Sequence, residues 1–110
     1  MRFGVWVRLC EAAGVAPGEP GVLQVRREVG LVEYPRGRSA MILYTAADDL
    51  RGACERLAAQ AGGMAWLVRW NRDPVGDPAG TVDRLIAEFV ERFGMKPEWT
   101  PEWSPEWSPE

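Results

Sequence analysis

The stretch that decides the fold is SAMILYTAADDLRGACERLAAQAGGMAWLVRW, which runs from Ser39 to Trp70. A short apolar run, Ser39–Thr45, precedes apolar residues at helical spacing up to Ala61, and a second apolar run, Met64–Trp70, follows. A strand, a helix and a strand in succession predict a right-handed crossover between parallel strands. Both faces of the second run are largely apolar, which is typical of a central strand.

On the N-terminal side of this unit, Val22–Tyr34 is rich in β-branched residues and predicts a strand, with Gly30 as a bend or bulge. Tyr34-Pro35-Arg36-Gly37 has proline and glycine at the positions that a β-turn favours, so this strand and Ser39–Thr45 are expected to form a hairpin. Further upstream, Arg2–Leu9 alternates with period two and predicts another strand. Leu9–Ala13 can add one helical turn before Gly14.

On the C-terminal side, the loop Asn71–Gly80 leads into a last helix, which either Asp77 followed by Pro78 or Thr81 is expected to cap. Gly94 is expected to end that helix. Its apolar residues recur at helical spacing and form one stripe: Val82, Leu85, Ile86, Phe89, Val90 and Phe93.

The predicted fold is therefore α+β, with the order β-β-β-α-β-α followed by an extended C-terminal tail. We expect a two-layer sandwich of ferredoxin-like character, in which amphipathic helices cover a sheet. Residues 1–95 form a single domain in this interpretation, and residues 96–110 form a Pro/Glu/Trp repeat tail. If both helices share one face of the sheet, a second subunit or the tail must cover the other.

The charge is unevenly divided along the chain. In residues 1–95 twelve Arg balance five Asp and seven Glu, so the net charge of −3 comes entirely from residues 96–110. A neutral body lacks the concentrated basic surface that nucleic-acid binding requires, so no nucleic-acid partner is expected. No stretch approaches the ~20 apolar residues of a membrane span, and no signal peptide is recognisable. We therefore expect a cytoplasmic protein without a membrane partner.

No recognisable catalytic set is present. The chain has no histidine, and Cys10 and Cys54 match no metal-binding or redox spacing. Asp73, Asp77 and Asp83 are interpreted as loop and helix-start acids rather than magnesium ligands. We therefore expect a non-enzymatic protein with no cofactor and no metal.

Two groups of arginines are candidate binding residues. Arg69 and Arg72 flank the start of the loop Asn71–Gly80, where α/β proteins bind anions before a helix N-terminus. The basic cluster on the predicted hairpin either guards a strand edge or contacts an acidic surface such as the tail. Its members are Arg26, Arg27, Arg36 and Arg38.

The tail, PEWTPEWSPEWSPE, alternates strictly between apolar odd-numbered and polar even-numbered residues from Pro97 to Glu110. In an extended conformation, which proline favours over helix, all three tryptophans share one face and the whole repeat spans up to about 45 Å. Every proline falls on the odd-numbered edge, so the other edge keeps all its N–H groups and can pair with an exposed strand. The expected partner-binding residues are Trp99, Trp103, Trp107, Pro101 and Pro105.

These patterns favour a protein-interaction or assembly module that uses the repeat as a tryptophan strap on a partner or a neighbouring subunit, so self-association into a homo-oligomer is expected. Two alternatives remain open. The loop at residues 71–80 can belong to a domain or enzyme that binds a small anion or nucleotide. The tail, with its Ser-Pro and Thr-Pro sites, can be a substrate for post-translational modification.

Overall fold

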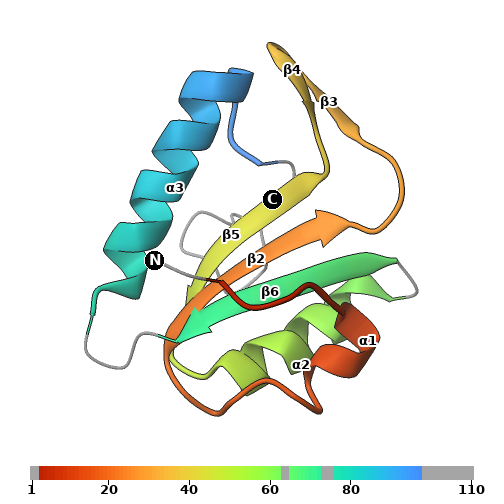
Figure 1. The fold of residues 1–110 in the computed structure, drawn as a ribbon, viewed down its shortest axis with the longest axis vertical. Helices are drawn as coiled ribbons and strands as arrows, with labels where there is room; N and C mark the ends of the chain where they lie inside the picture. The colour runs from red at the N-terminus through yellow and green to blue at the C-terminus, as the bar shows by residue number, and fades with distance from the viewer. Residues whose placement is uncertain (1–2, 63–64, 73–75, 98–110) are drawn as a thin grey trace, which may run out of the picture.

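A four-stranded sheet in the order β1-β6-β2-β5 is the centre of the fold, seen in a computed structural model that describes residues 3–62, 65–72 and 76–97 (Figure 1). A separate two-stranded ribbon pairs β3 with β4. The elements in chain order are β1 (Val7–Arg8), α1 (Leu9–Ala12), β2 (Gly21–Arg27), β3 (Val32–Tyr34), β4 (Gly37–Ser39), β5 (Met41–Ala47), α2 (Leu50–Ala61), β6 (Trp66–Arg72) and α3 (Pro78–Phe93).

Strand β2 lies between β5 and β6 and is antiparallel to both of them. The strands of the unit β5-α2-β6 are therefore parallel to each other, as expected, although β2 separates them. Strand β6 also pairs with β1, which gives it the interior position that its two apolar faces predict. The result is an α+β fold with an antiparallel four-stranded sheet.

The long strand expected over residues 22–34 is divided into two strands in the structure. Strand β2 ends at Arg27 and β3 begins at Val32, and between them Gly30 has a φ of 85° that turns the chain. The expected hairpin is confirmed in both of its parts. Strand β2 pairs with β5, and Tyr34 lies opposite Gly37 across the turn that joins β3 to β4.

The N-terminal strand is much shorter than the period-two alternation predicts. Val7 and Arg8 form the ladder with β6, the Gly4 N–H adds one bond to the Trp70 carbonyl at 3.1 Å, and Leu9 already begins α1. Leu9 and Ala12 are one helical turn apart and both are buried, so their packing against α2 favours the helical turn from Leu9 onward. The single helical turn expected at Leu9–Ala13 is thus present. Most of the missing strand lies before Val7, where Phe3 and Trp6 both contact the Arg69 guanidinium, although residues of opposite parity in a regular strand point to opposite faces.

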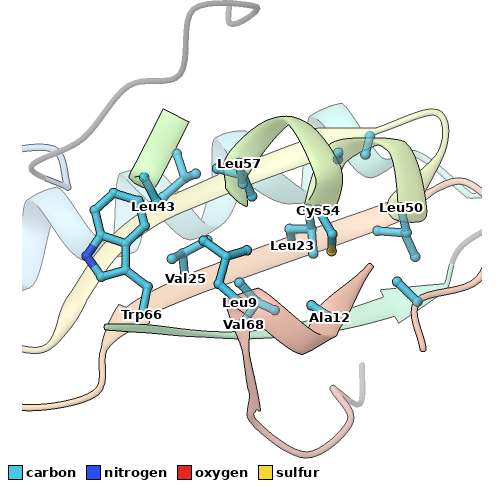
Figure 2. Packing of buried hydrophobic residues seen from close by; sticks show 14 of the residues in the cluster. Leu9, Ala12, Leu23, Val25, Leu43, Leu50, Cys54, Leu57, Trp66 and Val68 are labelled. Carbon is cyan, nitrogen blue, oxygen red and sulfur yellow. The ribbon is translucent and has the colours of Figure 1, made fainter. Parts of the chain in front are cut away.

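The main core lies on the face of the sheet that α1 and α2 cover, and Figure 2 shows its packing. Leu23 and Val25 of β2 and Val68 of β6 point into it, with no accessible surface. Leu50, Cys54 and Leu57 of α2 meet them from the helix side. Full burial of each such leucine or valine contributes about 1.5–3 kcal/mol to folding.

Helix α3 packs on the opposite face of the sheet. Phe89 meets Tyr34 with ring centroids 4.9 Å apart and Tyr44 with ring centroids 6.0 Å apart. Tyr44 follows Leu43 in β5, and neighbouring strand residues point to opposite faces. The expectation of a two-layer sandwich is therefore wrong. Strands β2 and β5 carry apolar side chains on both faces, so each face of the sheet takes a helix (Figure 1).

Helix α3 has the ends that its sequence predicts. Asp77 is the N-cap and accepts a hydrogen bond from the Gly80 N–H at 3.0 Å, with Pro78 at the first helical position. Gly94 ends the helix in the left-handed conformation, with φ 88°. Within the part of the chain that the structure describes, none of the helices has the length and apolar character needed to cross a membrane.

Candidate functional site

A row of polar side chains crosses the sheet on the face that α3 shares. Gln24 of β2 lies opposite Arg69 of β6 and opposite Tyr44 of β5, so these three residues are aligned across three strands. Gln24 is almost fully buried, at 5% exposure, and its Oε1 accepts a hydrogen bond of 2.6 Å from the Arg69 Nε. The row fixes the position of the Arg69 guanidinium.

A second guanidinium lies beside the first. Arg26 is opposite Leu67 in the register between β2 and β6, which makes Arg26 a diagonal neighbour of Arg69 on the same face. We call Arg26 and Arg69 the arginine pair. Two positive charges in neighbouring positions repel each other, so their proximity must be offset by other contacts.

Aromatic rings from the segment before β1 supply some of these contacts. The guanidinium carbons of Arg26 and Arg69 lie 4.6 Å and 4.5 Å from the centroid of the Trp6 ring. Arg69 also lies 5.2 Å from the centroid of the Phe3 ring. Cation–π contacts of this kind contribute about 0.5–2 kcal/mol each, depending on how far they are desolvated. The rings hold both guanidiniums and shield part of them from water.

The two positive charges of the arginine pair are not fully compensated by the groups around them. Burial and the neighbouring charge of Arg26 lower the pKa of Arg69 from its usual value. The Arg26 Nε is buried and forms no hydrogen bond with an acceptor among the described residues. Leaving a buried donor unpaired costs about 1–3 kcal/mol, and more when the group is charged.

No carboxylate of the described residues forms a salt bridge with either member of the pair; the salt bridges Arg8–Glu28, Arg38–Glu33 and Arg72–Glu19 involve other arginines. Guanidinium groups form their strongest hydrogen bonds with carboxylate and phosphate oxygens. The chemistry that this site can perform is therefore binding of an oxyanion, with an aromatic ring beside it.

The arginines predicted to form an anion site together are separated in the structure. Arg69 belongs to the arginine pair, whereas Arg72 ends β6 and forms a salt bridge of 3.5 Å with Glu19. An odd number of positions along a strand separates them, so they point to opposite faces of the sheet. Asp73, Pro74 and Val75 of the adjoining loop lie outside the described residues.

The basic cluster expected on the hairpin is also dispersed. Arg26 lies in the arginine pair, while Arg27 is opposite Trp66 on the other face of β2. Arg36 donates from Nη2 to the Val90 carbonyl at the end of α3, 3.2 Å away. Arg38 forms a salt bridge of 3.3 Å with Glu33 across the β3–β4 ribbon.

The tail residues expected to bind a partner, Trp99, Pro101, Trp103, Pro105 and Trp107, lie outside the described residues.

A pocket lies between the N-terminal ends of α2 and α3. This pocket of about 420 Å³ is lined by Asp48, Asp49, Asp77 and Arg56, together with small apolar residues. Asp49 and Asp77 are the N-caps of the two helices, a position where acidic side chains are favoured. No group of three His, Cys, Asp or Glu side chains suited to a metal ion occurs among residues 3–62, 65–72 and 76–97.

The two cysteines are free. Cys54 is buried on α2, and this burial raises the pKa of its thiol to about 11, which makes it unreactive near neutral pH. Cys10 is exposed on α1.

Comparison with family models, curated proteins and solved structures finds no match for this chain. Of the residues of the site, the sequence indicated Arg26 and Arg69 but not Gln24, Phe3 or Trp6. Alternation in Met64–Trp70 does separate Arg69 from the tryptophans of that run. The pairing of Arg69 with Gln24, however, depends on a register between distant segments that no local pattern reveals.

Proposed function

We propose that the chain is a non-enzymatic protein-interaction or assembly module. Its C-terminal repeat, residues 97–110, binds a partner or a neighbouring subunit as an extended strap, with Trp99, Trp103 and Trp107 as anchors. Buried tryptophans contribute more to interface energies than most residues. The three tryptophans of the body are already engaged in it: Trp66 and Trp70 pack with the core, and Trp6 stacks on the arginine pair.

One observation carries this proposal. Strand β5 lies at the edge of the four-stranded sheet, and beyond the bulge that its register with β2 shows at Ile42, its residues Leu43–Ala47 include no charged side chain. Edge strands are normally protected from pairing by charge, proline or bulges on the exposed strand. An uncharged edge is suited to the addition of an extended peptide whose own edge retains its N–H groups. The even-numbered edge of the repeat has this property.

The test compares the full chain with a variant that ends at Lys96. We expect the shortened chain to keep its circular-dichroism spectrum and to lose either self-association or partner binding, measured by light scattering and by affinity capture followed by titration with the purified partner. A triple variant, W99A/W103A/W107A, keeps every charge of the repeat and should behave in the same way. Unchanged mass and unchanged affinity in both variants would contradict the proposal.

A second candidate function is binding of a small oxyanion, and the buried, unpaired Arg26 Nε favours it. In this case the site is the arginine pair rather than Arg69 with Arg72. Thermal-shift measurements with phosphate, nucleotides and small carboxylates test this alternative. A ligand-dependent rise in the melting temperature that Arg69→Ala abolishes and Arg72→Ala preserves would support it.

A further inference from the structure

We propose that the arginine pair is the receptor for a glutamate carboxylate from the repeat of the same chain, within residues 98–110. This inference rests on the proposed function, which it deepens by naming where the repeat is held between encounters with a partner.

The chemistry of the site points to a carboxylate. The Nη atoms of Arg26 and Arg69 donate to no acceptor among the described residues, and no described carboxylate balances their two charges. The Trp6 ring covers both guanidiniums and lowers the local dielectric, which strengthens a charge-assisted hydrogen bond formed there. An anion placed between the two arginines also relieves their mutual repulsion, which contributes to the lowered pKa of Arg69.

The repeat supplies the matching charge. It carries Glu98, Glu102, Glu106 and Glu110 without a basic residue after Lys96, while the body is neutral. The whole negative excess of the chain is therefore located in the one segment that follows α3.

The position and length of the repeat favour the same chain as its source. Helix α3 lies on the same face of the sheet as the arginine pair, because Phe89 packs on Tyr44 of the polar row. The repeat begins within a few residues of Gly94, where α3 ends. Extended, it reaches about 45 Å at roughly 3.3 Å per residue, and the longest extent of the molecule is 36 Å. Tethering also gives a local concentration in the millimolar range, so a weak contact is sufficient.

This arrangement has a consequence for the tryptophans. Glutamates and tryptophans occupy alternate positions in the repeat and point in opposite directions when it is extended. A glutamate directed at the arginine pair turns the neighbouring tryptophans away from the sheet. The carboxylates then hold the strap on its own body while the tryptophans face a partner.

The experiment follows the arginine side-chain N–H signals of the full chain by NMR, with Arg26→Lys and Arg69→Lys for assignment. The comparison variant replaces all four repeat glutamates (E98Q/E102Q/E106Q/E110Q). We expect the Arg26 and Arg69 signals to differ between the two proteins, and 0.5 M salt to move the wild-type signals toward those of the variant. The Arg36 signal is the internal control and should not change, since its acceptor is the Val90 carbonyl.

Three results would overturn the inference. The first is identical Arg26 and Arg69 signals in the wild type and the four-glutamine variant. The second is signals that depend on protein concentration, because the carboxylate would then come from a neighbouring chain. In the third, the Arg26 and Arg69 signals are the same in the four-glutamine variant as in the wild type and then shift when sodium acetate or phosphate is added. That result would assign the site to a small anion.

Light scattering on the same proteins separates this inference from the proposed function. If W99A/W103A/W107A loses assembly while the glutamate substitutions leave the arginine signals unchanged, the proposed function is supported and the receptor of the repeat lies elsewhere. If the glutamate substitutions change the arginine signals but neither variant changes assembly or partner binding, the arginine pair is supported as the receptor and the proposed function is contradicted. Gln24→Glu gives a further check, because a carboxylate built in beside Arg69 should displace the repeat, so that in this background the four glutamine substitutions should no longer change the Arg26 and Arg69 signals.

Discussion

The backbone N–H of Arg36 donates to the carbonyl of Phe93 at 3.0 Å, which ties the turn between β3 and β4 to the last residue of α3. The Arg36 side chain adds a bond to the Val90 carbonyl, which also accepts the Gly94 N–H, so the hairpin supplies the partner of the Phe93 carbonyl at the helix end, where internal partners run out. The point from which the repeat departs is therefore held by the body.

Gly94 completes this junction, and we expect its replacement by alanine to be costly. Its φ of 88° disfavours any side chain, and a Cβ there would lie 3.0 Å from the Pro35 Cβ. We expect Gly94→Ala to destabilise the fold by roughly 2–4 kcal/mol, from left-handed strain plus overpacking. Gly30 has φ 85°, but a Cβ added there would meet nothing within 4 Å, so Gly30→Ala should cost only about 1–2 kcal/mol. Urea unfolding measures both, and equal losses would contradict the packing argument.

The N-caps of α2 and α3 give a second matched pair of variants. Asp77 accepts a hydrogen bond from the Gly80 N–H, whereas the Asp49 side chain makes no capping bond. Asp77→Ala should therefore lower the free energy of unfolding by about 1 kcal/mol, within the range of measured caps. Asp49→Ala should lower the free energy of unfolding by a smaller amount. A larger loss for Asp49→Ala in thermal unfolding would show that the acid-lined pocket depends on Asp49 for more than helix capping.

The contact between Gln24 and Arg69 yields a third prediction. Gln24→Leu keeps the side-chain size but removes the acceptor of the Arg69 Nε. We expect a loss of about 1–3 kcal/mol, because a partly buried charged donor is left unpaired. Gln24→Glu retains an acceptor and should stay within about 1 kcal/mol of the wild type. Chemical denaturation of the three proteins under identical conditions checks the order.

The raised pKa of the buried Cys54 thiol predicts a loss of stability at alkaline pH. Burial raises its pKa from 9.0 to about 11, so between these values the folded state keeps a proton that the unfolded state releases. Stability therefore falls as the pH rises from about 9 to about 11, by up to roughly 2–3 kcal/mol at 1.36 kcal/mol per pKa unit. Cys54→Ala should lose less stability over this range. A parallel fall in both proteins would assign the effect to other groups, such as Tyr44, whose pKa burial also raises.

Thiol labelling provides an independent measurement of the same environment. A thiol reagent at pH 8 should modify Cys10 in the folded protein and reach Cys54 only after unfolding, because Cys10 is exposed and Cys54 is buried. Mass spectrometry of the labelled protein should show one adduct in buffer and two in denaturant. Two adducts in buffer would mean that α2 opens readily.

Local patterns in the sequence were sufficient for several elements. The ends of α3 follow from Asp77, Pro78 and Gly94, each of which acts within one helical turn. The turn at Tyr34–Gly37 follows in the same way from proline and glycine. These features are predictable because the atoms that stabilise them belong to neighbouring residues.

Features that depend on distant segments were not predictable in this way. The contacts of Phe3 and Trp6 with Arg69 replace the first part of the predicted N-terminal strand, and the apolar character of both faces of β5 places α3 opposite α2. The arginine pair likewise exists only because β2 and β6 align Gln24 with Arg69. The ferredoxin-like character, the division at residue 95 and the role of the repeat stay predictions.

The sheet order sets a condition on how the chain is assembled during synthesis. Strand β6 is the last strand of the sheet to leave the ribosome, yet it belongs between β1 and β2, which are made much earlier. The β2–β5 hairpin can form as soon as its own residues emerge, but β1 has no strand to pair with until Trp66–Arg72 has been synthesised. The N-terminal segment therefore stays without its partner strand through most of translation. Pairing of β6 with β2 then also brings Arg26 and Arg69 together.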